Sequence, residues 1–385
     1  MTVSPTLSAR ILTSIGDIPA AQWDALIPSG SHPFLTHRFL HACEASGSAT
    51  STTGWTPRHI VIEDDSGTPL AAMPLYAKTH SQGEYVFDHA WADAYGRAGG
   101  HYYPKLQCSI PFTPASGPRL LAPTRDLRLA LLSALVQATE DWEMSSAHLT
   151  FLDTTDRASC EEAGFLIRED RQFHFIDRDY GDFDGFLASL ASRKRKNIRK
   201  ERARAQDGVT IHRLSGDDLN SEHWDAFYRF YLDTGERKWG RPYFTRDFFD
   251  RMQQTLRDDI VLVMAEMDGE WVAGALNYIG SDALYGRNWG TLIDKPFLHF
   301  ELCYYQAIDA ALERGIPRVE AGAQGEHKLA RGYEPVVTTS AHYLAHPGLR
   351  DAVGDYLKHE KRAVGREVDI LARHTPFRKG ELPSP

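Results

Sequence analysis

The stretch VEAGAQGEHKLARGYEP, residues 319–335, gathers an acid, an imidazole and two cations among three glycines and a closing proline. These side chains are Glu326, His327, Lys328 and Arg331. Core strands do not carry so many charges, because an unpaired charge is costly to bury. An anion cradle, an acid/base site and an exposed connector would each account for this composition. The rest of the chain has to decide among the three.

Three other segments carry side chains that could contact a ligand. The segment ALYGRNWG offers a candidate proton donor, an anion anchor and a polar contact, namely Tyr285, Arg287 and Asn288, followed by a tryptophan expected to pack. The other two are DHAWADAYGRAG, with Asp88, His89, Asp93 and Tyr95, and ERKWGRPYF, with Arg237, Lys238, Trp239 and Arg241. Both could contact an acceptor amine, and packing of their aromatic side chains is the competing explanation.

The run SRKRKNIRKERAR holds eight cations between residues 193 and 204 and a single acid, Glu201. At helical spacing these charges surround the helix instead of forming one stripe. A solvated helix gains nothing from such self-repulsion, so the run predicts an anionic partner such as tRNA or another phosphate-bearing ligand. The alternative is a helix held by acidic residues of the same protein.

The composition limits the class of protein. With 385 residues, the chain is long enough for two domains. Its formal net charge of -9 argues against a protein whose whole surface binds nucleic acid. Its four cysteines stand far apart, without the ligand spacing of a zinc site, and we predict no metal. No apolar run approaches the length of about 18 residues typical of a membrane span. We expect a cytoplasmic protein.

The order of predicted elements repeats along the chain. Each half contains helices, a hairpin of strands, a further helix and a strand, which suggests an internal duplication. Tight turns followed by one crossover helix predict a mixed α/β sheet in each half. We expect an N-terminal domain at residues 1–178, a C-terminal domain at 179–346 and a helical tail at 347–385. Residues 183–208 read as one long helix that ends at a glycine.

Seven segments together resemble the FemAB-like family of N-acyltransferases of the GNAT superfamily, a family associated with peptidoglycan biosynthesis and recognition. They are GWTPRHIVIED, AMPLYAKTHSQGEYVFDHAWADAY, YYPKLQCSIPFTPASGPRLL, SRKRKNIRKER, RKWGRPYFTRDFF, FELCYYQAID and GAQGEHKLARGYEP. The resemblance covers roughly residues 15–375. It implies tandem GNAT-like domains, a degenerate N-terminal copy and a site carried mainly by the C-terminal copy.

The resemblance also favours a functional interpretation of residues 319–335. Lys328, Gly332 and Tyr333 match the Lys-x-x-x-Gly-aromatic segment of Fem-type relatives. Here Lys328 and Arg331 would hold an anionic group. The candidate catalytic residues are Glu326 as base, His327 as its alternative and Tyr285 as acid; the candidate substrate contacts are Gln324, Gly325, Lys328, Arg331, Arg287, Asn288, Asp93 and Arg241.

The expected reaction is the direct attack of an acceptor amine on an activated acyl group. No bound cofactor is expected, and the acyl donor is a co-substrate, either aminoacyl-tRNA or acyl-CoA. Members of the superfamily that use acyl-CoA carry a glycine-rich turn at a helix N-terminus. The segment GTLIDKPFLHF lacks the glycine spacing of that turn. This absence favours aminoacyl-tRNA as the acyl donor. The alternatives are an acyl-CoA-dependent N-acetyltransferase and a recognition protein that binds a peptide or cell-wall ligand without turnover.

Overall fold

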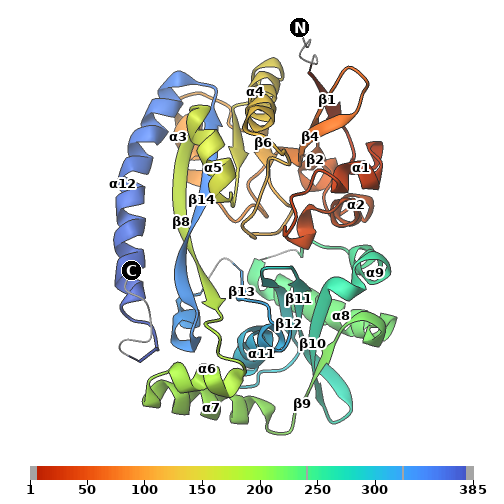
Figure 1. Cartoon of the computed structure of the whole chain (residues 1–385), viewed down its shortest axis with the longest axis vertical. Coiled ribbons are helices and arrows are strands. Elements are labelled where there is room, and N and C mark those ends of the chain that lie inside the picture. The colour runs from red at the N-terminus through yellow and green to blue at the C-terminus, as the bar shows by residue number, and fades with distance from the viewer. Residues whose placement is uncertain (1–6, 240–241, 323–324, 379–385) are drawn as a thin grey trace. The chain divides into compact units, whose positions relative to one another are not determined.

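The structure, a computed structural model, describes residues 7–239, 242–322 and 325–378 (Figure 1). Within these ranges, the side chains of residues 236–239 and 326 lie outside the description. The chain divides into two compact units. Unit 1 comprises Met1–Asp170 and Val337–Gly365, and unit 2 comprises Arg171–Val336 and Arg366–Pro385.

Unit 1 contains a small antiparallel sheet and a larger mixed sheet. The small sheet has the order β1-β3-β4, and the larger one contributes β2-β5-β6-β7-β14. Their bounds are β1 Ser8–Leu12, β2 Trp55–Pro57, β3 His59–Glu63, β4 Pro69–Met73, β5 Leu75–Lys78, β6 Lys105–Cys108, β7 Ser146–Leu149 and β14 Glu334–Leu344. The helices are α1 Ala20–Asp24, α2 His37–Ala45, α3 His89–Arg97, α4 Arg125–Asp141, α5 Thr154–Glu162 and α12 Pro347–Ala372.

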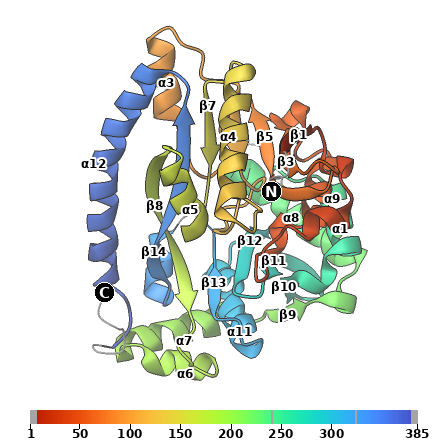
Figure 2. The same cartoon turned by 45° about the horizontal axis from the view of Figure 1, so that its top comes forward.

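The two faces of the larger sheet in unit 1 differ in chemistry. Leu106, Ala147 and Leu149 point to the face that α4 covers, where they join a buried apolar cluster (Figure 2). Lys105 and His148 alternate with them along the same strands, so they point to the opposite face, and both are buried. Unit 1 therefore buries polar side chains across a whole sheet face.

Unit 2 contributes strands in the order β8-β13-β12-β11-β10-β9. Its strands are β8 Leu166–Ile176, β9 Thr210–Leu214, β10 Ile260–Met267, β11 Glu270–Ile279, β12 Leu284–Thr291 and β13 Arg318–Glu320. Its helices are α6 Phe183–Ser189, α7 Ser192–Gln206, α8 Ser221–Trp239, α9 Arg246–Thr255, α10 Leu298–Phe300, the π-helical turn η6 Glu301–Tyr305, α11 Gln306–Glu313 and the 3-10 turn η7 Glu326–Arg331.

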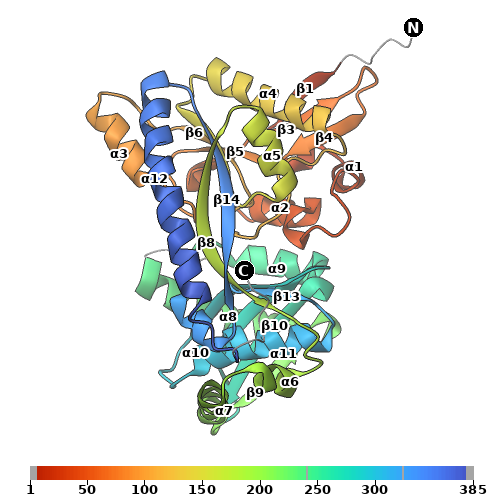
Figure 3. The ribbon, with the colours of Figure 1, turned by 60° about the vertical axis from the view of Figure 1, so that its left-hand side comes forward.

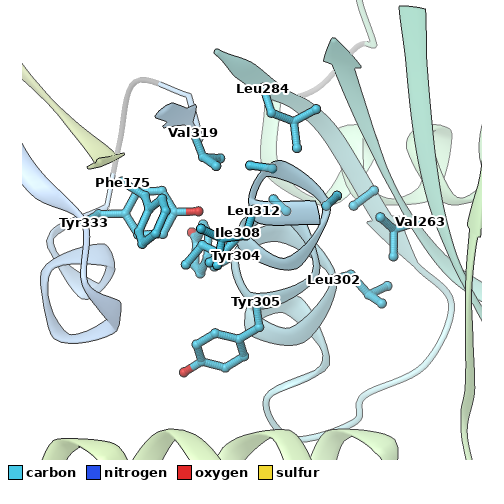
Figure 4. Close-up of a cluster of buried hydrophobic side chains, with 14 of the residues drawn as sticks. Phe175, Val263, Leu284, Leu302, Tyr304, Tyr305, Ile308, Leu312, Val319 and Tyr333 are labelled. Atoms are coloured by element: carbon cyan, nitrogen blue, oxygen red, sulfur yellow. The ribbon is translucent and has the colours of Figure 1, made fainter. Parts of the chain in front are cut away.

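The core of unit 2 joins strand and helix side chains. Val263, Leu284 and Val319 extend from the sheet toward Ile308 and Leu312 of α11 (Figure 4). Alternation of apolar residues along the strands and their helical spacing in α11 produce this contact. Full burial of side chains of this kind stabilises by about 1.5–3 kcal/mol each. The core fixes α11, and with it the turn η6, against β12 and β13.

The two observed units differ from the predicted domains at residues Val337–Gly365, which belong to unit 1. Residues Ala341–Leu344 of β14 pair with β7 in unit 1, although the sequence placed them in the C-terminal domain. The helix α12 continues from that strand, and its Leu349 and Val353 pack with Trp91 of α3 (Figure 3). An alternating strand pattern fits either sheet, so sequence alone could not assign this strand.

The prediction of one long helix over residues 183–208 is wrong. The structure has two helices, because Leu190 and Ala191 are extended between α6 and α7. The backbone N–H of Ala191 donates to the carbonyl of Pro376 at 2.9 Å, and Leu190 forms an isolated β-bridge with Phe377. A backbone hydrogen bond to the C-terminal segment of the chain therefore takes the place of a helical hydrogen bond at Ala191.

Candidate active site

The strands β12 and β13 of unit 2 separate after a short parallel contact. They pair only at Leu284–Val319 and Tyr285–Glu320, whereas β12 continues to Thr291. Beyond Tyr285, the edge of β12 that faces β13 has no strand partner among the described residues. Ligands of α/β folds bind beyond the carboxyl ends of parallel strands, where neighbouring chains diverge.

A β-bulge in β12 lies at the same place. Asn277 of β11 is opposite Gly286 and Leu276 is opposite Asn288, so Arg287 is an extra residue in the ladder. Bulges of this kind redirect a side chain and are frequent beside active sites. The side chains of Arg287 and Asn288 are half-buried, and the Oδ1 atom of Asn288 has no hydrogen-bond partner among the described residues.

Lys328 is the most unusual side chain near this opening. It is 1% exposed, and its Nζ donates to the carbonyl of Gly322 at 2.8 Å. No carboxylate among the described side chains pairs with it. Burial lowers the pKa of Lys328 to about 7; the thiol of Cys303 opposes this effect, and the guanidinium of Arg287 adds to it. The amine is therefore partly neutral at physiological pH.

His327 and Arg331 flank this lysine and have defined partners. The Nε2 atom of His327 lies 2.8 Å from the hydroxyl of Tyr304. Arg331 is 7% exposed, donates from Nη2 to both carboxylate oxygens of Glu201 at 3.0 Å, and stacks 3.4 Å from the centre of the Phe300 ring. Its charge is therefore balanced within the protein, while its role as an anion contact stays a prediction.

Tyr285 is buried, with its hydroxyl donating to Asp282 at 3.1 Å. Burial, followed by the carboxylates of Glu320 and Asp282, raises the pKa of Tyr285 far above its usual value. The phenol keeps its proton at neutral pH and can donate a hydrogen bond. Proton release during turnover would be difficult for this group.

The other predicted site residues are dispersed or not described. Asp93 lies exposed on α3 of unit 1. Gly325 precedes η7 with a positive φ of 117°, which a glycine adopts readily. Gln324 and Arg241 lie outside the described residues, as does the side chain of Glu326. Unit 2 thus brings Arg287 close enough to Lys328 to affect its pKa, and His327 and Arg331 flank Lys328 in η7.

Sequence analysis missed Glu201, Tyr304 and Cys303. Glu201 and Tyr304 contact the charged turn directly, and Cys303 affects the pKa of Lys328. One signal was available, because Glu201 is the single acid in a run of eight cations. No local pattern marks Cys303 or Tyr304, since their helix packs like any amphipathic helix.

In unit 1, the expected ligand residue Asp88 belongs to a buried ion cluster. Its Oδ2 accepts hydrogen bonds from Lys105 and from the hydroxyl of Tyr102, both at 2.6 Å. Lys105 also donates to Oε2 of Glu84 at 2.7 Å. Burial acts to lower the pKa of Lys105, but the carboxylates of Glu84 and Asp88 outweigh it, so this pKa is raised. The cluster pairs its own charges internally.

The helix α7 divides its charges between two sides. Arg202 donates to Glu301 at 3.0 Å and to Asp309 at 2.7 Å, and Ile198 and Ala205 are buried. The structure records no ion pair with any described residue for six other cations, which are Arg193, Lys194, Arg195, Lys196, Lys200 and Arg204. Acidic residues of the protein therefore hold Arg202 on one side of this helix, while Arg193, Lys196, Lys200 and Arg204 form a cationic stripe on the opposite side.

Two general features complete the description. None of the helices within the described residues is both long and apolar enough to cross a membrane. In the same part of the chain, no group of three or more His, Cys, Asp or Glu side chains is placed to hold a metal ion.

Several solved structures share this fold at low sequence identity. FemX matches with a TM-score of 0.53 and 14% identity, over 88% of this chain and 98% of its own. L-PGS from Bacillus licheniformis matches with a TM-score of 0.50 and 10% identity, over 88% and 96%. The C-terminal domain of a putative lysylphosphatidylglycerol synthetase from Agrobacterium fabrum gives 0.52 and 11%, over 82% and 96%. The mixed α/β fold with a C-terminal helix, as predicted, is confirmed.

Comparison with curated proteins gives no match. The family model described as FemAB-like, peptidoglycan biosynthesis/recognition, matches residues 14–379, nearly the whole chain. This match confirms the resemblance seen in the sequence segments. The chain belongs to the FemAB-like family.

Proposed function

We propose that this protein is an N-acyltransferase that moves an acyl or aminoacyl group to an amine of a small or peptide-like acceptor, of the cell-wall-precursor type, by direct attack. Membership of a family described by peptidoglycan biosynthesis/recognition supports this class of acceptor. The folds of FemX and L-PGS are consistent with it.

Lys328 is the observation that carries the proposal. An amine that attacks an acyl carbonyl has to lose a proton, and a proton acceptor works best when its pKa lies near the operating pH. Burial brings the pKa of Lys328 to about 7 beside the opening between β12 and β13. Glu326 and His327 remain candidates for the same proton, through the sequence pattern alone.

The strand β12 supplies a cation for the acyl carbonyl. The bulge in β12 redirects Arg287, and the guanidinium of Arg287 lies close enough to Lys328 to lower the pKa of its amine. A cation aimed at a developing oxyanion stabilises an acyl-transfer transition state. In this proposal Arg287 holds the carbonyl oxygen, and Lys328 accepts the amine proton. As the new amide bond forms, the bond from the acyl carbon to the ester oxygen of aminoacyl-tRNA (or the thioester sulfur of acyl-CoA) breaks, and the leaving group takes up the proton from Lys328.

The cationic side of α7 supports a donor that carries phosphates. Six cations without an ion pair to described residues occur on this helix, although the whole chain has a net charge of -9. A helix of 15 residues is roughly 22 Å long, which exceeds the span of one pyrophosphate and suits a nucleic-acid backbone. Aminoacyl-tRNA is therefore our preferred donor, with acyl-CoA as the alternative.

Two substitutions at one position test the role of Lys328. Lys328→Met removes the amine, and Lys328→Arg keeps a cation that cannot lose its proton at neutral pH. Both should lower kcat by about 10²–10⁴-fold if Lys328 is the proton acceptor. Activity retained in Lys328→Arg would refute this role and leave only an electrostatic one. Lys358→Met, at an exposed position on α12, is the matched control and should keep full activity.

Thermal unfolding with acetyl-CoA, longer acyl-CoAs and a charged-tRNA mixture tests the donor. A ligand at about 100 times its Kd stabilises the folded state by roughly 2.7 kcal/mol, which gives a measurable shift in Tm. A shift with charged tRNA supports the proposal. A shift only with acyl-CoA would replace the donor, and ligand binding without turnover would favour a recognition protein.

A further inference from the structure

The cationic helix α7 is bonded directly to the turn that carries Lys328. Glu201 of α7 accepts hydrogen bonds from Nη2 of Arg331 at 3.0 Å on both carboxylate oxygens. Its Oε2 also accepts a hydrogen bond from Tyr305 at 2.5 Å. Glu201 therefore points inward from a helix whose other charges are almost all positive.

Arg331 continues this connection into η7. Its Nη1 donates to the carbonyl of His327 at 2.7 Å, and the next residue along the chain is Lys328. Stacking on the Phe300 ring restricts the guanidinium plane. Glu201, Arg331 and the backbone of His327 thus form a short path from α7 to the base of the lysine side chain.

Attachment of α7 to the core does not require Glu201. The neighbouring Arg202 bonds two acids of η6 and α11, Glu301 and Asp309, and Gln206 donates to Glu301 at 2.9 Å. The buried side chain of Ile198 adds an apolar contact. These bonds end on core helices, whereas Glu201 bonds both Tyr305 of η6 and Arg331 on the turn with the candidate catalytic lysine.

We propose that the Glu201–Arg331 ion pair couples donor binding on α7 to the placement of Lys328, which makes both members positioning residues. This inference rests on the proposed function. A phosphate-bearing donor that contacts the outer cations of α7 restrains the helix, and the ion pair passes this restraint to η7. The same pair keeps the carboxylate of Glu201 away from the donor phosphates, which it would repel.

The test compares Glu201→Gln with Asp309→Asn in the full chain. Both substitutions replace an acid by its amide, but Asp309 lies on the path that ends in the core. We expect Glu201→Gln to lower kcat by about 10- to 100-fold, because small misplacements of a catalytic group have effects of this size. The KM for the acceptor and the Kd for deacylated tRNA should stay within about twofold. Asp309→Asn should leave kcat unchanged.

Hydrogen exchange separates positioning from a merely structural role. In the wild-type protein, deacylated tRNA should slow amide exchange both in α7 and in residues 327–333. In Glu201→Gln, protection of α7 should persist while protection of residues 327–333 is lost. Arg331→Lys keeps the charge but cannot bridge both acceptors, so it should behave like Glu201→Gln.

The outcomes distinguish the two proposals. If the wild-type protein neither binds deacylated tRNA nor uses aminoacyl-tRNA as an acyl donor, the proposed donor is wrong and this inference is wrong with it. If the wild-type protein does both, but Glu201→Gln keeps its kcat and the protection of residues 327–333, the coupling is refuted while the donor stands. A doubly substituted protein, Glu201→Gln with Arg331→Lys, should lose no more kcat than either single variant, because both act through one pair.

Discussion

Each unit buries a lysine beside a parallel pair of strands, and the two lysines have opposite surroundings. Lys105 of unit 1 donates to two carboxylates, Glu84 and Asp88, and its pKa is raised. Lys328 of unit 2 donates to a backbone carbonyl, and its pKa is lowered to about 7. Both side chains are 1% exposed, so burial alone does not explain the difference.

This difference distinguishes a buried lysine that stabilises the fold from a buried lysine that can exchange a proton. A buried cation with two acids stays charged, holds its neighbours together and has no proton to exchange near neutral pH. A buried cation without a carboxylate is destabilised in its charged form and exchanges a proton near pH 7. Perturbed groups of the second kind are typical of active sites. Lys78 of unit 1 is also buried, and burial lowers its pKa to about 7 as well, so this criterion marks one lysine in each unit. Our proposal assigns the acyl transfer to Lys328, and Lys105 serves the fold.

The largest expected effect is on stability in unit 1. Lys105→Met leaves Glu84 and Asp88 buried without their main cation, so we expect the free energy of unfolding to fall by about 3–5 kcal/mol. Lys328→Met removes a buried amine that has no acidic partner among the described side chains and whose burial opposes folding near pH 7, so it should leave the free energy of unfolding unchanged or raise it. Urea unfolding of both variants measures the difference. Equal losses would invalidate the distinction between the two lysines.

The pH dependence of stability sharpens the same comparison. The pKa of Lys328 is lower in the folded state than its usual value of 10.5, so the unfolded chain binds more protons between pH 7 and 10.5. The contribution of Lys328 to stability therefore rises with pH across this range, by at most about 1.4 kcal/mol per pH unit. Relative to Lys328→Met, the wild-type protein should gain stability from pH 7 to 9.

The titration of Lys105 itself should not make the stability depend on pH between pH 7 and 9. Its folded pKa is raised, so its contribution is fully present below its unfolded pKa and is lost only as the pH rises through the folded value. The stability deficit of Lys105→Met should instead follow Glu84: burial raises the pKa of Glu84 to about 7, and loss of the Lys105 cation raises it further, so the deficit grows from pH 7 to 9. Unfolding curves at pH 7, 8 and 9 for both variants and the wild-type protein check these slopes. A flat difference for Lys328→Met would contradict its lowered pKa.

The smallest effect is expected at the surface of unit 2. Arg199 of α7 pairs with Asp184 at 3.1 Å, and both side chains are largely exposed. Exposed pairs contribute little, so Asp184→Asn should change the free energy of unfolding by about 0.5 kcal/mol or less. The substitution also frees a cation of α7, which should tighten tRNA binding at low salt. A loss above about 1 kcal/mol would show that exposure is a poor guide to these ion pairs.

Local patterns predicted much of the fold and part of the candidate site. The hairpin strands β10, β11 and β12 follow from apolar runs separated by turns with Asp-Gly and Gly-Ser-Asp. The charged turn at residues 326–331 stood out because glycines surround it. The bulge at Arg287 had no local signature, because it arises from the register between β11 and β12.

Sequence by itself determined which elements form and which residues are able to hold or move a proton, because propensity, periodicity and side-chain chemistry are local properties. Tertiary structure alone decided what each charge faces. Burial without a carboxylate made Lys328 a weak acid, two buried acids kept Lys105 charged, and β14 joined the sheet of unit 1. A pKa and a strand partner depend on groups distant in the chain, and a linear pattern carries no record of those distances.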